Sequence, residues 1–257
     1  MKLNEKIHMK RYFLHIQYKG TNYHGWQVQP NAITVQEEVE GALSTIFQDK
    51  VDVMGAGRTD TGVHASCLIA HFDREESFSI KDVKFKLNNI LSRSISIDSI
   101  REVQPEFHAR FDATSRSYEY RIGFKKDPFL EETSFVVTKK LDVRKMNKAA
   151  QLLLGEKDFS CFSKSKTQTF TNNCNVVEAV WVETLYGVMF KIKANRFLRN
   201  MVRAIVGTLL EVGEGKRSVE SMEALILSKN RSNAGFSVPA RGLFLVDIEY
   251  PQEGFIE

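Results

Sequence analysis

Two alternating stretches joined by a tight turn constrain the fold of this chain more than any other feature. Apolar and polar residues alternate in "VVEAVWVETL" (176–185) and in "GVMFKIKA" (187–194), and Tyr186-Gly187 lies near the turn between them. Strands connected so closely pair antiparallel, as a β-hairpin. A hairpin within the chain argues against a doubly wound parallel sheet, so we predict an α+β fold with mixed or antiparallel sheets.

The rest of the chain alternates strand and helix patterns. Period-two alternation predicts further strands at 11–18, 51–57, 67–72, 117–124 and 242–250. In the strand at 117–124, Tyr118 shares one face with Tyr120 and Ile122, and we expect the latter two to be core residues.

Helices are predicted from capping residues and apolar spacing. Thr34 with Glu37 three residues later forms a capping box, and Asp142 caps a later helix. A helix over 79–91 is expected to turn Val83, Leu87 and Ile90 inward. The last two helices are predicted at about 196–212 and 219–227.

Two strand–helix–strand halves suggest an internal pseudo-repeat. We divide the chain into an N-terminal α+β half, 1–110, and a C-terminal α+β half, 111–257. No low-complexity linker separates them, and five prolines are too few to mark a hinge region.

Composition narrows the class of protein. The net charge of +4 suits a polyanionic partner without requiring one. The three cysteines are far apart, which favours reduced thiols over disulfides or a zinc framework. The stretch "MKLNEKIHMKRYF" lacks the apolar core of a signal peptide, and no run approaches the length of a membrane span, so a cytoplasmic location is expected.

The densest chemical motif is "GAGRTDTGVHA", residues 55–65. A dinucleotide fingerprint starting at Gly55 would need glycine where Asp60 stands, and that carboxylate would repel a pyrophosphate. The spacing of Gly57 and Gly62 fits a phosphate loop, but Val63-His64 follows where lysine and a hydroxyl residue are required. Neither nucleotide site fits this motif.

Asp60-Thr61-Gly62 is also the signature of an aspartic protease, which needs two carboxylates sharing one proton. The chain has a single such triplet, and Arg58 two residues before it favours a permanently ionised carboxylate instead. The histidines lack metal-ligand spacing and are expected to pack or hydrogen-bond. A plain turn in which Asp60 caps backbone amides remains open for the motif taken alone.

Arginines mix with aromatic residues elsewhere in the chain. In "FHARFDATSRSYEYRI" (107–122) such a mixture suits RNA, whose bases stack on rings while its phosphates meet guanidinium groups. In the predicted helix at 196–212, Arg196, Arg199 and Arg203 line the side opposite the apolar face. The apolar neighbours of Arg203 indicate a cleft, where an arginine seeks a carboxylate or phosphate.

Five motifs together resemble the TruA family of tRNA pseudouridine synthases. They run in order through nearly the whole chain: "YHGWQVQP", "GRTDTGVHA", "HARFDATSRSYEY", "FLRNMVRAIVGTLLEVG" and "ARGLFL". Two departures are visible, because Thr61 stands where alanine is usual and "TFTNNCN" (169–175) lacks an arginine often found there.

The resemblance implies two fused ferredoxin-like halves and the isomerisation of uridine to pseudouridine at positions 38 to 40 of tRNA. It implies Asp60 as the nucleophile, Arg203 as its ion-pair partner and Tyr118 against the uracil. Arg58 would shape the loop, Leu243 would wall the pocket, and Arg110 and Arg199 would contact the RNA. No cofactor or metal is implied, the partner is the anticodon stem-loop, and the assembly is a homodimer.

Two other functions remain as alternatives. The first is a non-catalytic tRNA-binding or chaperone module on the same fold, and the second, more remote, is a dimeric aspartic protease. Whether Asp60 attacks C1′, attacks C6 or abstracts a ribose proton stays open at this point.

Overall fold

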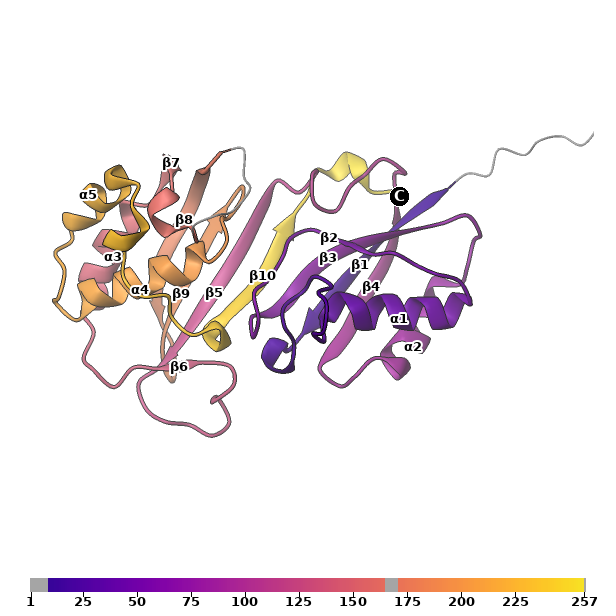
Figure 1. The fold of residues 1–257 in the computed structure, drawn as a ribbon, viewed down its shortest axis with the longest axis horizontal. Helices are drawn as coiled ribbons and strands as arrows, with labels where there is room; N and C mark the ends of the chain where they lie inside the picture. The colour runs from indigo at the N-terminus through magenta and orange to yellow at the C-terminus, as the bar shows by residue number, and fades with distance from the viewer. Residues whose placement is uncertain (1–8, 165–170, 257) are drawn as a thin grey trace, which may run out of the picture. The chain divides into compact units, whose positions relative to one another are not determined.

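The computed structural model describes residues 9–164 and 171–256, which form two compact units (Figure 1). Unit 1 contains the chain up to Thr114 and again from Ile248, and unit 2 contains Ser115–Asp247. The division expected from the sequence, after residue 110, differs because the chain returns to unit 1 at its end. Parts of "SKSK" (163–166) and "TFTNNCN" lie outside the described residues.

The sheet of unit 1 is antiparallel. Strand β1 (Lys10–Tyr18) lies between β3 (His64–Arg74) and β4 (Ile95–Val103) and pairs antiparallel with both. The alternation that predicted β1 is confirmed, because Leu14 and Ile16 are fully buried.

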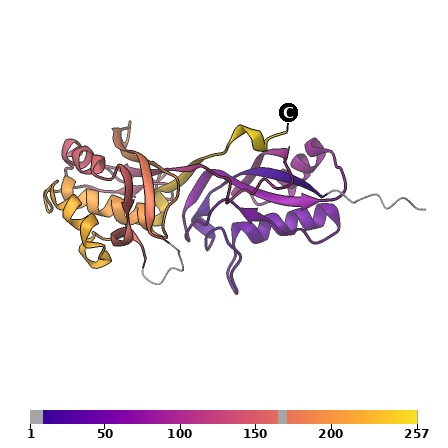
Figure 2. The same ribbon diagram turned by 90° about the horizontal axis from the view of Figure 1, so that it is seen from above.

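Two capped helices belong to this unit, and α1 lies along one face of its strands (Figures 1 and 2). In α1 (Val35–Phe47) the Thr34 hydroxyl accepts a hydrogen bond from the Glu37 N–H at 3.4 Å, which confirms the predicted cap. In α2 (Ile80–Ile90) the prediction for Ile90 was wrong, because its side chain is 49% exposed. Ile90 ends the helix, and Leu91, in extended backbone, is buried instead.

The predicted strand at 51–57 is reduced to β2 (Met54–Gly55), which pairs with β3. Before β2, the backbone bonds to side chains of α1 in place of a strand. The Val53 N–H donates to Glu40 Oε1 at 2.9 Å, and the Val51 N–H donates to Ser44 Oγ at 3.0 Å. The apolar alternation was visible in the sequence, but this competition for the backbone was not.

An aromatic cluster joins the last described residues to unit 1. The ring of Phe13 lies 5.2 Å from the rings of both Phe107 and Tyr250, and 6.2 Å from that of Phe255. The Gln104 N–H donates to the Gly254 carbonyl at 3.0 Å. The core of unit 1 is thus completed by residues that follow unit 2 in the sequence.

Unit 2 contains the predicted hairpin, and its strand order is β10-β5-β9-β8-β7. Strand β8 (Asn173–Glu183) pairs antiparallel with β9 (Gly187–Ala194), which pairs antiparallel with β5 (Ser115–Gly123). The remaining strands are β6 (Phe135–Val136), β7 (Gly155–Asp158) and β10 (Leu243–Glu249). Because β6 runs parallel to β5, the sheet is mixed, and the predicted α+β class is confirmed.

In the described part of unit 2 the helices are α3 (Val143–Gln151), α4 (Met201–Gly213) and α5 (Ser221–Ser228). The predicted cap of α3 is confirmed, since Asp142 Oδ1 accepts from the Lys145 N–H at 3.0 Å. Helix α4, orange in Figure 2, is almost wholly buried and contacts α3. Short 3₁₀ turns occur at Gly20–Asn22, Ser160–Phe162, Arg231–Asn233, Ala240–Gly242 and Gln252–Gly254.

The predicted start of α4 was wrong by one and a half turns. Asn200 has left-handed backbone (φ 66°), so the helix begins at Met201. The Arg199 carbonyl accepts from the Lys164 N–H at 3.1 Å, a tertiary bond in place of a helical one. Arg196 and Arg199 therefore precede the helix, and the expected arginine stripe does not exist as a helix face.

Candidate active site

Asp60 lies on the loop between β2 and β3, and this loop is fixed by its backbone. The Trp26 N–H donates to the Thr59 carbonyl at 3.3 Å, and the Gly62 N–H donates to the Tyr23 carbonyl at 3.2 Å. The Val63 N–H closes a turn on the Asp60 carbonyl at 3.1 Å. The motifs "YHGWQVQP" and "GRTDTGVHA" are therefore two sides of one hydrogen-bonded unit.

Glycine makes this close approach possible. Gly25 has a φ of +94°, and a Cβ there would stand 2.4 Å from the Thr59 carbonyl oxygen. A Cβ at Gly20 would stand 2.0 Å from the Val63 carbonyl oxygen. Both distances are shorter than real contacts, so a side chain at either position would push the Asp60 loop away.

Buried polar groups hold the loop beneath Asp60. The Tyr18 hydroxyl and the Thr59 hydroxyl share a hydrogen bond of 2.7 Å, and His64 Nδ1 accepts from the Gly20 N–H at 3.0 Å. These side chains are buried, whereas Asp60 is half-buried and Arg58 is exposed. A loop fixed by hydrogen bonds thus holds a half-buried carboxylate in unit 1.

Tyr118 and Leu243 belong to neighbouring strands of unit 2. Tyr118, on β5, is half-buried, and its ring meets Phe197 edge-on at 5.1 Å with an interplanar angle of 84°. Leu243 begins β10 and is buried. As predicted, Tyr120 and Ile122 are core residues at 0% and 3% exposure.

Arg203, on the first turn of α4, is tied to residues 234–239, which we call the strap. Its Nε donates to the Val238 carbonyl at 2.7 Å, and the Val238 N–H donates to the Arg203 carbonyl at 3.2 Å. The Tyr120 hydroxyl donates to the Pro239 carbonyl at 2.8 Å, and burial raises the pKa of this hydroxyl. The strap therefore sets the direction of the Arg203 guanidinium.

Side chains anchor the strap in turn. The Gly235 N–H donates to Thr208 Oγ1 at 2.9 Å, and Arg231 donates to the Gly235 carbonyl at 3.1 Å. The Ser237 hydroxyl accepts from Arg231 Nη2 at 3.0 Å and from Asn200 Nδ2 at 2.6 Å. Sequence reasoning missed these residues, although a threonine inside the apolar run of α4 was a usable signal.

The two remaining predicted RNA contacts, Arg110 and Arg199, are exposed, Arg110 in unit 1 and Arg199 in unit 2. Asp60 and Arg58 belong to unit 1, whereas Tyr118, Arg203 and Leu243 belong to unit 2. Asp60 and Arg203 belong to different units, and their pairing stays a prediction.

A family model described as tRNA pseudouridine synthase matches residues 15–112 and 149–251. The chain belongs to the tRNA pseudouridine synthase family. The matched residues include the Asp60 loop, Arg203 and the strap, while Tyr118 lies between the two matched segments. The resemblance found in the sequence motifs is thereby confirmed.

Curated relatives in this family cover nearly the whole chain. It is 50% identical to tRNA pseudouridine synthase A of Bacteroides fragilis over 249 residues, which is 96% of this chain and 99% of the relative. It is 49% identical to that of Parabacteroides distasonis over 96% of this chain and 98% of the relative. The identity to tRNA pseudouridine synthase A of Francisella tularensis is 38%, with 96% of each chain covered.

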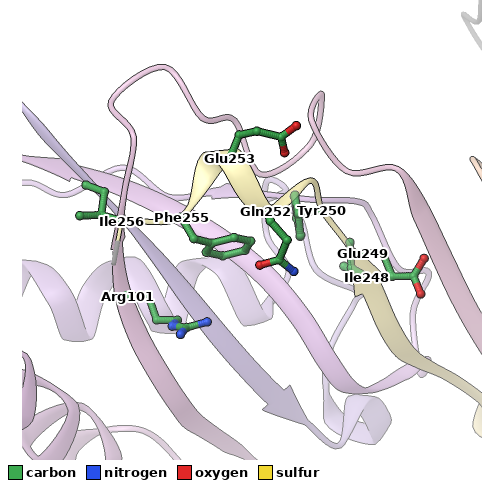
Figure 3. A pocket seen from close by; sticks show the side chains of 8 residues that line it. All are labelled: Arg101, Ile248, Glu249, Tyr250, Gln252, Glu253, Phe255 and Ile256. Carbon is green, nitrogen blue, oxygen red and sulfur yellow. The ribbon is translucent and has the colours of Figure 1, made fainter.

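A separate groove of about 700 Å³ lies on unit 1 of this family member and contains none of the predicted residues (Figure 3). Arg101 comes from β4, and the other lining residues come from 248–256. The Arg101 guanidinium lies 5.5 Å from the centre of the Phe255 ring.

Within residues 9–164 and 171–256, no cluster of three or more metal-ligating side chains occurs. The helices in these residues are too short or too polar to cross a bilayer.

Proposed function

We propose that the chain converts uridine to pseudouridine at positions 38, 39 and 40 in the anticodon stem-loop of tRNAs. The observation that carries the proposal is the hydrogen-bonded loop that holds Asp60 half-buried, in a chain of this family. The protein would act as a cytoplasmic homodimer.

The reaction exchanges one bond for another. The bond between N1 and C1′ breaks, the uracil turns, and C5 bonds to C1′, while the proton on C5 leaves to water and N1 gains one. An ionised carboxylate serves such a reaction as a nucleophile, and Asp60 is the group that we assign to it. With no net redox change or hydrolysis, the isomerisation requires no cofactor.

The other predicted residues support that carboxylate and the base. Arg203, aimed by the strap, would pair with Asp60 and orient it. Tyr118 would lie against the uracil, and Leu243 would wall the pocket. Arg58 is exposed beside Asp60 and would contact the RNA.

Reaching Asp60 requires the target base to leave its stack, at a cost of about a few kcal/mol. Contacts between phosphates and exposed arginines offset this cost, and Arg110 and Arg199 are the two that we assign. A non-catalytic tRNA-binding or chaperone module would need these contacts but not the rigid carboxylate loop. A dimeric aspartic protease would need a carboxylate from each copy sharing one proton, but no phosphate contacts.

The test is the release of tritium from tRNA labelled at uracil C5 by the wild type and by Asp60→Asn. Asparagine keeps the size of the side chain but removes the nucleophile, so we expect normal tRNA binding and no release of label. Asp52→Asn is the matched control, because its side chain is 78% exposed and close in sequence. That variant should release label at the wild-type rate.

Label released by Asp60→Asn at the wild-type rate would contradict the assignment of the nucleophile. A wild-type protein that binds tRNA and releases no label would instead favour the binding module. Peptide cleavage with no effect on tRNA would favour the protease.

A further inference from the structure

Phe111 is an exposed aromatic residue that the catalytic proposal does not use. Its side chain is 74% exposed, although the neighbouring Phe107 is 7% exposed and belongs to the aromatic cluster of unit 1. Leaving a phenyl ring in water sacrifices the free energy that its burial would supply. An exposed ring on a hydrogen-bonded turn is therefore a candidate contact surface.

The turn that carries Phe111 is tightly built. Asp112 Oδ2 accepts from the His108 N–H at 2.6 Å, and the Asp112 N–H donates to the His108 carbonyl at 3.1 Å. His108 Nδ1 accepts from the N–H groups of Arg110 and Phe111, at 3.0 and 3.3 Å. The backbone under Phe111 is thus fixed before any partner arrives.

Two histidine rings follow one another in contact with the exposed phenyl group, the first tilted against it and the second edge-on to the first. The His108 ring centre lies 4.4 Å from that of Phe111 and 4.6 Å from that of His71. Burial lowers the pKa of both imidazoles, that of His71 to about 4. Both rings are therefore neutral near pH 7, as acceptance of N–H groups at Nδ1 requires.

A cation lies over the same ring. The Arg110 guanidinium carbon is 5.7 Å from the centre of the Phe111 ring, and Arg110 is exposed. The turn therefore offers an apolar face and a positive charge next to each other. Proteins bind unpaired nucleotides with this combination, since the base stacks on an aromatic ring while the phosphate contacts a guanidinium group.

We propose that Phe111 and Arg110 form a stacking platform for an unpaired base of the tRNA substrate. The base lies on the Phe111 ring, and its phosphate meets Arg110. The proposal rests on the proposed function, because it assumes a tRNA substrate. It adds a contact whose role is binding and not chemistry.

Phe129 provides a matched control. It is 94% exposed, and Asp127, Glu131 and Glu132 lie within three residues of it, with Glu131 paired to Arg241 at 3.2 Å. Like charge disfavours a phosphate there. An exposed phenyl ring in an acidic setting separates stacking on RNA from the general effect of removing a surface aromatic residue.

The first measurement compares Phe111→Ala, Phe111→Tyr and Phe129→Ala in Kd for an anticodon stem-loop and in the steady-state rate of tritium release. Loss of one base stack corresponds to about a tenfold rise in Kd and KM. We expect that rise in Phe111→Ala with kcat within about twofold of wild type. Phe111→Tyr should restore the affinity, and Phe129→Ala should match the wild type.

The second measurement detects stacking directly by fluorescence. In Phe111→Trp, titration with the stem-loop should quench the new indole saturably, while Phe129→Trp should not respond. Trp26 and Trp181 are 2% and 3% exposed and serve as a constant background. The concentration dependence of the signal without RNA reports contact between copies of the protein.

Three outcomes would overturn the platform: unchanged affinity in Phe111→Ala, no quenching in Phe111→Trp, or a signal that depends on protein concentration alone. The last outcome would assign the turn to an interface between copies. Failure of the proposed function has a different signature, because RNA would still quench Phe111→Trp while the wild type releases no tritium.

Discussion

The Asp60 loop and the strap position the two charged groups of the proposed site by different means. The loop is held by backbone hydrogen bonds and by glycines that let two backbones touch. The strap is held mainly by the side chains of Thr208, Arg231 and Asn200, although it also passes close to Gly207, where an added Cβ would stand 1.8 Å from the Phe236 carbonyl oxygen. Both segments therefore leave no room for a Cβ at these glycines, and they differ in that the strap depends more on removable side-chain hydrogen bonds.

Gly25→Ala tests the glycine side of this contrast. Left-handed backbone costs about 1 to 2 kcal/mol for alanine, and crowding against the Thr59 carbonyl adds about 1 to 3 kcal/mol. We expect the free energy of unfolding to fall by about 2 to 5 kcal/mol and pseudouridine formation to fall with it. Denaturant unfolding and tritium release measure the two effects.

Gly41→Ala is the control for that substitution. Gly41 lies within α1 with no heavy atom within 4 Å of an added Cβ, so alanine should raise the free energy of unfolding by up to about 1 kcal/mol. Equal losses in the two variants would remove close backbone approach as the explanation.

The two units differ in histidine content, because all six histidines lie in the sequence of unit 1. A loss of stability caused by histidine protonation therefore originates in unit 1. His71 has a folded-state pKa of about 4 and an ordinary pKa of 6.5. Between these values the unfolded chain binds a proton that the folded chain does not, so stability falls as the pH falls through this window. The loss reaches up to about 3 kcal/mol near pH 4 and is absent above pH 6.5.

His71→Gln should flatten this dependence. Glutamine does not titrate, yet its amide oxygen can accept from the Ala109 N–H as His71 Nδ1 does at 3.1 Å. Unfolding measured from pH 7.5 to pH 4 in both proteins gives the two slopes. Identical slopes would show that His71 is not the acid-sensitive group of unit 1.

Thr208→Val tests the side-chain hold on the strap. Valine has nearly the same shape but leaves the buried Gly235 N–H without its acceptor, at a cost of about 1 to 2 kcal/mol. Because the strap aims Arg203, we expect kcat to fall more than tRNA affinity. Thr45→Val is the control, since the hydroxyls of Thr45 and Thr208 both donate to the carbonyl four residues earlier in their helices, but Thr45 is exposed. A Thr208→Val enzyme with wild-type kcat would show that the strap does not set the Arg203 geometry.

The same contrast explains which parts were predictable from the sequence. Local signals sufficed for the caps at Thr34 and Asp142, for the hairpin and for the motif around Asp60, because each depends on neighbouring residues. The contacts of Arg203 depend on Val238, which lies 35 residues away and which no local pattern reports. The start of α4 and the shortened β2 were mispredicted for a similar reason, as distant groups took the backbone bonds that the local pattern assigned to helix or strand.

The return of the chain to unit 1 affects the order in which the protein folds during synthesis. Residues 115–247 form unit 2 without interruption, so that unit has all its parts once they leave the ribosome. Most of unit 1 is translated earlier, but its aromatic cluster is complete only after Tyr250 and Phe255 have been synthesised. Translation of unit 1, which contains Asp60, therefore starts first and ends last. The Asp60 loop belongs to a unit whose core is incomplete until unit 2 has been synthesised.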